Sequence, residues 1–227
     1  MKKVVVITGA SSGFGKEVAK LLLQKNTYHL ILTGRNNLGF EEFTNSPDVT
    51  LVVGDLTKKS TIDLIEDAVK EQKRIDILVN NAGITFINPL AENTEQKIDD
   101  LLAINLKAPM ILTQRLFPLM VQQQSGQIIN INSTAGKEGK QNHTIYSAAK
   151  FGLKGFTDAL RLEAKPHNIR VMSFHPGGIN TELYRHLENI PKEKFMDPTK
   201  VAEILSKDNF FTAFAVFPSL FEGDTRM

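Results

Sequence analysis

A tyrosine and a lysine four positions apart are the residues of this sequence best placed to move a proton. They lie in the segment Tyr146-Ser147-Ala148-Ala149-Lys150, inside a longer stretch of helical periodicity. Residues four apart share one face of a helix, so we expect the Lys150 ammonium to lower the pKa of the Tyr146 hydroxyl from its free value of about 10. A tyrosine tuned in this way can give a proton to a substrate oxygen or take one from it.

Ser133 is the third residue with suitable chemistry. It stands thirteen residues before Tyr146, at the end of a strand predicted over Gln127–Asn132. Its hydroxyl could donate a hydrogen bond to the same substrate oxygen as negative charge develops there. Taken singly, a tyrosine is usually a packing residue and a lysine is usually solvated, so it is the combination of the three that favours catalysis.

A glycine-rich turn follows the first predicted strand, Val4–Thr8. The turn reads Thr8-Gly9-Ala10-Ser11-Ser12-Gly13-Phe14-Gly15 and leads directly into a helix predicted over Gly15–Gln24. Glycines permit positive φ and close approach of the backbone, while a helix N-terminus offers free N–H groups and a positive dipole end to a pyrophosphate. A glycine cluster alone is often only a turn, but this placement between strand and helix favours a dinucleotide site.

The residue after the second strand indicates which dinucleotide the site prefers. The segment Leu32-Thr33-Gly34-Arg35-Asn36 places an arginine there, and the first acid that follows is Glu41. An acid would bind the ribose 2′-hydroxyl of NAD, whereas an arginine attracts the 2′-phosphate of NADP. Arg35 could also be a solvated surface residue. The sequence favours NADP over NAD.

Two later strand ends are expected to face the same ligand, because ligands of doubly wound sheets lie outside the carboxyl ends of the strands. The residues are Asp55 and Leu56, after a strand over Val49–Val53, and Asn81, Ala82 and Gly83, after a strand over Ile77–Asn80. Asp55 could accept a hydrogen bond from the adenine amino group, or it could cap a helix that begins near Thr57. The sequence leaves both interpretations open.

Short β-branched segments alternate with longer segments of helical periodicity along the chain. The remaining predicted elements are strands over Leu30–Thr33 and Ile169–Phe174, and helices over Thr61–Gln72, Glu95–Gln124, Thr144–Ala164 and Thr199–Leu205. This alternation predicts a Rossmann-type α/β fold, in which a doubly wound, mostly parallel sheet carries helices on both faces. No repeat or linker divides the chain, so we expect one domain over residues 1–227. Its tail diverges from about residue 207, with Phe211–Phe217 as a candidate last strand.

Composition narrows the function classes. The 227 residues have a formal net charge of +2 with scattered basic residues, so neither nucleic-acid binding nor a membrane-surface helix is indicated. The absence of cysteine excludes disulfides, thiolate metal sites and cysteine nucleophiles, and the five histidines lack the spacing of metal ligands. No apolar run reaches the roughly 18 residues of a membrane span. We expect a cytoplasmic protein that acts on a small molecule and holds no metal.

In the order of its motifs, the chain resembles the short-chain dehydrogenase/reductase family over residues 1 to about 200. The motifs are Thr8-Gly9-x-x-x-Gly13-x-Gly15, Asp55-Leu56, Asn80-Asn81-Ala82-Gly83, Asn105, Ser133, Tyr146-x-x-x-Lys150 and Pro176-Gly177. The resemblance implies that Tyr146 is the general acid in carbonyl reduction and the base in alcohol oxidation. It also implies that Lys150 holds the nicotinamide ribose hydroxyls, that Ser133 polarises the carbonyl, and that Asn105 holds a water linking Lys150 to solvent.

The resemblance extends to a set of cofactor contacts. They would be made by Thr8, Gly9, Ser11, Ser12, Gly13, Phe14, Gly15, Arg35, Asp55, Leu56, Asn81, Ala82, Gly83, Tyr146, Lys150, Pro176, Gly177, Ile179 and Thr181. Without the resemblance, the segment from Pro176 to Thr181 would be an ordinary turn leading to a helix capped by Thr181. Two residues depart from the family pattern: Phe14, which we expect to pack inward, and Asn132, where the family often has a serine.

These observations predict an oxidoreductase that transfers a hydride between NADP(H) and a ketone/alcohol pair, with reduction favoured. Residues 84–91, 136–143 and 182–197 would set substrate identity, but their mixed composition names no substrate. The family's subunit contacts would use the helical stretches Ala103–Gln124 and Tyr146–Ala164, which favours a homodimer. The alternative is a catalytically idle NADP(H)-binding regulator or scaffold. A sugar-nucleotide epimerase or dehydratase is disfavoured, because the chain has no room for a larger substrate domain.

Overall fold

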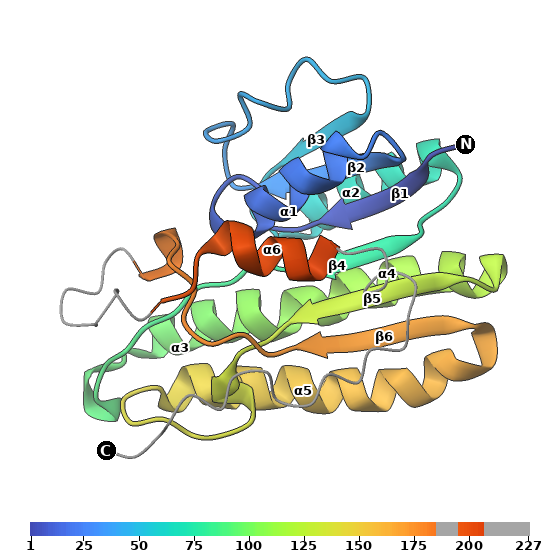
Figure 1. Ribbon diagram of the computed structural model, residues 1–227. Coiled ribbons are helices and arrows are strands. Elements are labelled where there is room, and N and C mark those ends of the chain that lie inside the picture. The colour runs from blue at the N-terminus through green and yellow to red at the C-terminus, as the bar shows by residue number, and fades with distance from the viewer. Residues whose placement is uncertain (185–194, 207–227) are drawn as a thin grey trace.

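Six parallel strands form one sheet within the part of the chain that the computed structural model describes, residues 1–184 and 195–206 (Figure 1). The strands are β1 (Lys3–Ile7), β2 (Tyr28–Gly34), β3 (Val49–Val53), β4 (Ile77–Asn80), β5 (Gly126–Ile131) and β6 (Ile169–Phe174). Their order is β3-β2-β1-β4-β5-β6, so the direction of winding reverses beside β1. The predicted doubly wound parallel sheet is confirmed, and the reversal marks where such sheets bind ligands.

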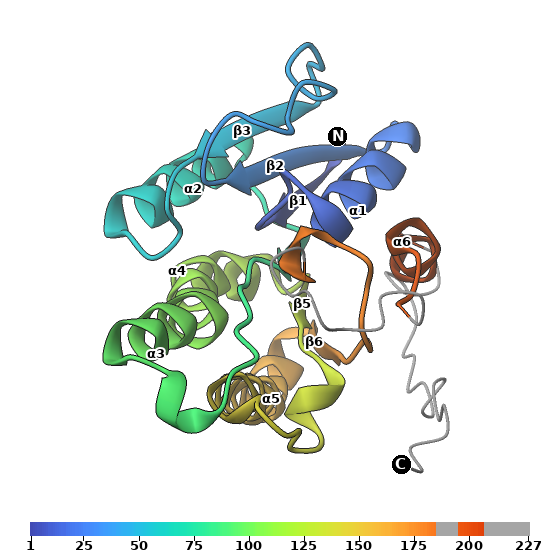
Figure 2. The same ribbon diagram turned by 90° about the vertical axis from the view of Figure 1, so that its left-hand side faces the viewer.

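Helices cover both faces of the sheet. They are α1 (Gly13–Gln24), α2 (Lys59–Gln72), α3 (Glu95–Leu102), α4 (Ala108–Gln123), α5 (Thr144–Ala164) and α6 (Pro198–Ser206), with 3₁₀ turns at Leu90–Glu92, Thr134–Gly136, Lys165–His167 and Glu182–Tyr184. Seen along the strands, α1 and α6 lie on one side and α2 and α4 on the other (Figure 2). None of the helices in the described ranges is long and apolar enough to cross a membrane.

Alternation along the strands builds two apolar layers. In β1, Val5 and Ile7 belong to the core cluster that includes residues of α1 and α6, whereas Val4 and Val6 belong to the cluster that includes residues of α2, α4 and α5. Successive side chains of a strand point to opposite faces, so a continuous run of β-branched residues fills both layers. The sheet is therefore held rigidly between helices, and its carboxyl edge positions the loops of the site.

The prediction of one unbroken helix over Glu95–Gln124 is wrong in its middle. The structure has α3, then a π-helical turn over Ala103–Lys107, then α4. The π turn contains Asn105, whose side-chain amide donates to the carbonyl of Leu101, one turn earlier, at 3.1 Å. Sequence periodicity cannot show such a local insertion, because it is read over windows much longer than the single turn that holds the extra residue.

Other element bounds differ from the predicted ones by one or two residues. Thr8 and Asn132, predicted as the last strand residues, lie just beyond β1 and β5, and α1 and α2 begin two residues earlier than expected. The candidate strand Phe211–Phe217 and most of the predicted lid, residues 185–194, lie outside the described residues.

Candidate active site

The turns after β1 and β4 are joined by side-chain hydrogen bonds. The Thr8 hydroxyl accepts from the backbone N–H groups of Asn81, at 2.9 Å, and Ala82, at 3.0 Å. In return, the Asn81 amide donates to the carbonyls of Thr8, at 2.8 Å, and Gly9, at 3.1 Å. Two segments predicted to contact the same ligand therefore form one unit at the carboxyl edge of the sheet.

Glycines in the first turn are required by its backbone and by close packing. Gly9 and Gly13 have φ of +66° and +55°, values that residues with a Cβ rarely adopt. A Cβ at Gly13 would lie 2.9 Å from the Cβ of Thr181, so the segment after β6 presses directly on the glycine turn. Ser12 precedes α1, and within the described part of the chain its hydroxyl does not cap that helix. The result is a cradle with an uncapped helix N-terminus, which fits a pyrophosphate.

Ser11 lies beside the end of β2. A Cβ at Gly34 would be 2.8 Å from the Ser11 hydroxyl oxygen, and the Ala10 N–H donates to the Thr33 carbonyl at 2.8 Å. Arg35 follows Gly34 directly and is exposed. The Ser11 hydroxyl and the exposed side chain of Arg35 therefore both belong to the end of β2, and the two groups together are suited to bind a phosphate monoester.

Asp55 does not cap α2. That helix begins at Lys59 with Lys58 at its N-cap, and the Asp55 carboxylate closes a turn by accepting from the N–H and hydroxyl of Thr57, at 2.9 and 2.8 Å. These two hydrogen bonds lower the pKa of Asp55, with a small further contribution from the nearby Arg35 charge. Asp55 is thus ionised, exposed and close to Arg35. Its neighbour Leu56 is buried in the core and could meet a ligand only through its backbone.

Tyr146 and Lys150 are both buried on α5. The Lys150 ammonium donates to the Ile131 carbonyl at 2.9 Å and lies 5.6 Å from the centroid of the Tyr146 ring. The Ser133 side chain lies beside the Tyr146 hydroxyl, near enough to lower the pKa of that hydroxyl. The structure therefore brings together the three residues that the sequence predicted would act on one substrate oxygen.

The expected lowering of the Tyr146 pKa is wrong for this structure. Burial raises the pKa of Tyr146, the nearby Tyr184 raises it further, and the Ser133 side chain only partly offsets these effects. Burial also lowers the pKa of Lys150 to about 8. Desolvation disfavours the charged form of both groups, and at this depth that outweighs the helical spacing on which the prediction was based. Tyr146 is consequently held in its protonated form.

Ser133 occupies the second position after β5. Its hydroxyl accepts from the Ala135 N–H at 3.1 Å and so caps the 3₁₀ turn over Thr134–Gly136. One lone pair of the hydroxyl is thereby fixed, while its proton remains available for a partner such as Tyr146 or a bound oxygen.

Asn105 fastens the chain that leaves β4. Its amide nitrogen donates to the Ile84 carbonyl at 2.9 Å, and its amide oxygen accepts from the Ile84 N–H at 3.3 Å. A Cβ at Gly83 would lie 2.5 Å from that oxygen, which accounts for the glycine. The π turn aims the amide at the backbone of the site. The role of holding a water for Lys150 stays a prediction.

The segment after β6 forms the remaining wall. The Thr134 N–H donates to the Pro176 carbonyl at 3.1 Å, and Gly177 follows. The N–H of Met196 donates to the Gly178 carbonyl at 2.9 Å, which forms an isolated bridge beside the buried Ile179. Phe14 packs inward as expected, with its ring stacked 6.0 Å from that of Phe174.

Each of the three segments expected to set substrate identity, residues 84–91, 136–143 and 182–197, places at least one side chain near Tyr146. Ile84 and Phe86 pack in its apolar cluster, and the His143 ring meets its ring edge-on at 6.4 Å. Tyr184, which sequence reasoning did not single out, influences the pKa of Tyr146 and packs its ring 4.8 Å from that of Phe195. Its only sequence signal was its place three residues after Thr181.

His175 and Ser173 are two further residues of the site that the sequence did not indicate. The two ring nitrogens of His175 are hydrogen-bonded to the Ser133 carbonyl and to the Ser173 hydroxyl. No group of three His, Asp or Glu side chains is arranged to hold a metal ion within residues 1–184 and 195–206.

Comparison with known proteins places this geometry among related chains. A family model described as short chain dehydrogenase matches residues 3–191. The chain is 34% identical over 219 residues to the 3-oxoacyl-[acyl-carrier-protein] reductase of Thermotoga maritima, which covers 89% of this chain and 88% of that protein.

Solved structures share the fold over almost the whole chain. The 3-ketoacyl-(acyl-carrier-protein) reductase of Brucella melitensis, complexed with NADH, aligns with a TM-score of 0.82 at 27% identity and covers 92% of each chain. An actinorhodin polyketide ketoreductase variant with NADPH aligns with a TM-score of 0.80 at 28% identity, over 90% of this chain and 88% of that one.

Proposed function

This chain belongs to the short-chain dehydrogenase family, and we propose that it is an NADP(H)-dependent reductase that converts a ketone to an alcohol with Tyr146 as the proton donor. The observation that carries the proposal is the buried Tyr146 side chain, with the Ser133 side chain near enough to lower its pKa and the Lys150 ammonium 5.6 Å from its ring. A protein that only binds a nucleotide has no physical need for a buried, paired phenol at this position.

NADP(H), when bound, supplies or accepts the hydride. The cradle formed by Gly9, Gly13 and the N-terminus of α1 would hold its pyrophosphate, and Thr181, pressed against Gly13, would lie beside it. Ser11, Ser12, Phe14 and Gly15 belong to the same turn, and Ala82, Gly83, Pro176, Gly177 and Ile179 to the two walls. The Lys150 ammonium is the group that would hold ribose hydroxyls.

The preference for NADP(H) rests on the corner formed by Ser11 and Arg35. A guanidinium and a hydroxyl can bind a 2′-phosphate together, and no acid stands at the end of β2 to bind a ribose hydroxyl in its place. The ionised Asp55 lies close enough to Arg35 for the Arg35 charge to lower its pKa. Its carboxylate would be able to accept a hydrogen bond from the adenine amino group. Solved relatives carry either cofactor form, NADH in one and NADPH in another, so the support for NADP(H) comes from this corner and not from the comparisons.

The proton step follows from the protonation states. Tyr146 is held as the neutral phenol, which is the form that a carbonyl reduction requires, and its proton would pass to the substrate oxygen. The Ser133 hydroxyl would donate a second hydrogen bond to that oxygen. The phenolate left on Tyr146 would be stabilised by the Lys150 ammonium until a proton from solvent restores it.

The deciding experiment is a panel of ketones and of 3-ketoacyl thioesters offered with NADPH and NADH in parallel. We expect substrate-dependent oxidation of NADPH, with NADH much less effective. Tight NADPH binding without turnover across the panel would instead indicate the idle regulator or scaffold.

We also propose a homodimer formed through α4 and α5. The π turn that leads into α4 packs against α5, since a Cβ at Gly152 would lie 3.0 Å from the Leu106 side chain. Their outer surface exposes large apolar side chains, with Met110 and Ile111 each 39% exposed and Phe151 43% exposed. Exposed apolar side chains on two helices favour burial against a second copy.

A further inference from the structure

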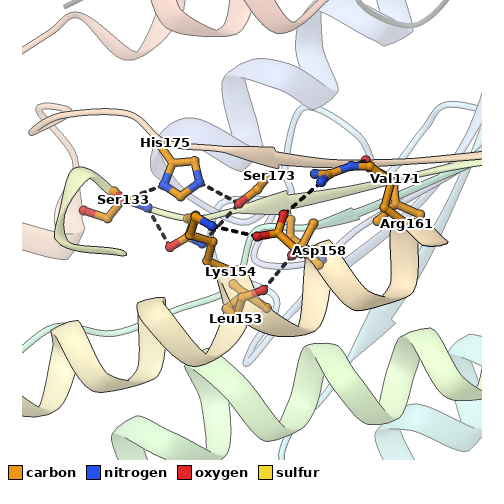
Figure 3. A network of polar contacts seen from close by, with 11 residues as sticks. Ser133, Leu153, Lys154, Asp158, Arg161, Val171, Ser173 and His175 are labelled. Carbon is orange, nitrogen blue, oxygen red and sulfur yellow. Dashed lines mark hydrogen bonds and ion pairs between the residues drawn. The ribbon is translucent and has the colours of Figure 1, made fainter. Parts of the chain in front are cut away.

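The backbone of Ser133 is held from both sides by a closed ring of four hydrogen bonds. The Ser133 N–H donates to the Asn132 amide oxygen at 3.0 Å, and the Asn132 amide nitrogen donates to the Ser173 hydroxyl at 3.1 Å. Ser173 contacts His175 Nε2 at 2.9 Å, and His175 Nδ1 contacts the Ser133 carbonyl at 2.8 Å. Figure 3 shows the His175 ring between Ser133 and Ser173.

One direction of donation satisfies every member of the ring. A carbonyl can only accept, so His175 carries its proton on Nδ1, and in the neutral ring Nε2 must then accept from the Ser173 hydroxyl. Ser173 in turn accepts from Asn132, which accepts from the Ser133 N–H. The chain of donors therefore runs head to tail from the Ser133 N–H back to the Ser133 carbonyl.

The ring joins the carboxyl ends of β5 and β6, since Asn132 and Ser133 follow β5 whereas Ser173 and His175 lie at the end of β6. Asn132 and Ser133 are 3% and 8% exposed, so the hydrogen bond between them is buried, whereas the bonds to Ser173 and His175 are part-buried. Asn132 uses its two amide atoms for two partners, a span that a serine, with one oxygen, would not reach. Ser133 is thus fixed through its backbone while its hydroxyl stays directed at Tyr146.

We propose that Asn132, Ser173 and His175 are positioning residues that act through Ser133, and that the neutral Nδ1–H form of His175 is the form that holds Ser133 in place. The proposal rests on the proposed function, because it assigns the ring to the group that polarises the carbonyl. None of the three residues touches the reacting atoms. Their effect is on the orientation of the hydroxyl that does.

Protonation of His175 reverses one donor in the ring. A proton on Nε2 turns that atom into a donor, and the Ser173 hydroxyl proton must leave the ring. Burial lowers the pKa of His175 from its ordinary 6.5, and Lys137 and Lys154 lower it further, whereas the Ser133 carbonyl and Asp158 oppose the shift. Lys154 itself is paired with Asp158 at 2.7 Å (Figure 3). The head-to-tail order of donors is therefore complete at neutral pH and is lost in acid, where the Ser173 hydroxyl accepts from both Asn132 and His175 and its own proton needs another acceptor.

The test separates the two hydrogen bonds of His175 by substitution. His175→Asn keeps an N–H donor where Nδ1 lies, whereas His175→Gln keeps a group only where Nε2 lies. We expect kcat to fall about tenfold in His175→Gln and in Ser173→Ala, with KM and NADPH affinity within twofold of wild type, and to be mostly retained in His175→Asn. The loss of kcat below pH 6.5 in the wild type should be weaker in His175→Asn, which has no imidazole to titrate.

The control is His167→Asn, a histidine loss in the 3₁₀ turn after α5, and it should leave kcat and its pH profile unchanged. Equal kcat and equal pH profiles in wild type and His175→Gln would overturn the proposal. Imidazole ¹⁵N chemical shifts give a readout independent of turnover, and they should show neutral His175 with the proton on Nδ1 at pH 7. Absence of turnover in the wild type would contradict the proposed function, and the positioning role with it. A neutral His175 with its proton on Nε2 would contradict only the proposed ring of hydrogen bonds.

Discussion

At the scale of single residues, burial decides the chemistry that the sequence could only outline. The motif residues were identified from type and spacing, and the structure brings Ser133, Tyr146 and Lys150 together. The sign of the Tyr146 pKa shift could not be predicted, because spacing on one helix shows which charges are near but not how much water is removed. Tyr184 and His175 escaped for a similar reason, since neither lies in a motif of defined spacing.

Lys150 should lower the stability of the folded protein. Burial lowers its pKa from 10.5 to about 8, so the unfolded chain binds its proton more tightly. Above pH 10.5 Lys150 is neutral in both the folded and the unfolded chain, and its protonation does not affect the free energy of unfolding. As the pH falls to about 8 the unfolded chain takes up this proton first, which lowers the free energy of unfolding by about 3 kcal/mol. We expect Lys150→Met to be inactive yet more stable than wild type at pH 7, by about 2 kcal/mol once the lost bond to Ile131 is counted.

Urea unfolding of the wild type and of Lys150→Met across pH 7 to 10.5 measures this difference in the free energy of unfolding. The difference should become smaller as the pH rises, because only the wild type is stabilised by deprotonation of Lys150. A Lys150→Met protein that is clearly less stable at pH 7 would show that the buried ammonium is stabilising.

Arg35 should discriminate between the two cofactors. Arg35→Ala removes charge-assisted hydrogen bonds to a 2′-phosphate, which are worth about 1.5–3 kcal/mol, and should weaken NADPH binding by roughly 10- to 100-fold. NADH has no such phosphate and should bind about as before. Fluorescence titration with both nucleotides provides the measurement, and an equal loss for both would remove the basis for an NADP preference.

At the scale of elements, strand and helix patterns predicted the architecture, whereas local geometry lay beyond them. The β-branched runs located every described strand, since both faces of a parallel sheet are apolar. The π turn around Asn105 could not be predicted, because it depends on the fit of one amide to the backbone of Ile84. The packing of Gly13 on Thr181 depends in the same way on a contact between distant segments.

That packing makes Gly13 sensitive to a single methyl group. Gly13→Ala places a Cβ 2.9 Å from that of Thr181 and forces φ of +55° on a residue that disfavours it. We expect a loss of about 1–2 kcal/mol in unfolding free energy and at least tenfold weaker NADPH binding, measured by urea denaturation and titration.

Gly155→Ala is the matched control. This glycine lies in the exposed middle of α5, where a Cβ meets nothing within 4 Å. The same substitution should raise stability there by about 1 kcal/mol and leave NADPH binding unchanged. Equal effects at the two positions would mean that Gly13 has no special place in the site.

At the scale of the whole molecule, the two apolar layers leave α4 and α5 with an uncovered apolar surface. Phe151→Glu places a charge on that surface, and we expect it to give monomers at concentrations where the wild type is a dimer. Light scattering after size-exclusion chromatography measures the mass. Leu38→Glu, at an exposed apolar residue away from both helices, should leave the dimer intact. A wild type that is already monomeric would contradict the proposed interface.

The central claim is that Tyr146 donates the proton, and a single substitution of its hydroxyl tests it most directly. Tyr146→Phe should bind NADPH with wild-type affinity but reduce a carbonyl substrate of the wild type about 10²- to 10⁴-fold more slowly, as expected for loss of a general acid. Steady-state NADPH oxidation by the two proteins, measured side by side with that substrate, is the decisive measurement. Turnover by Tyr146→Phe close to that of the wild type would contradict the account.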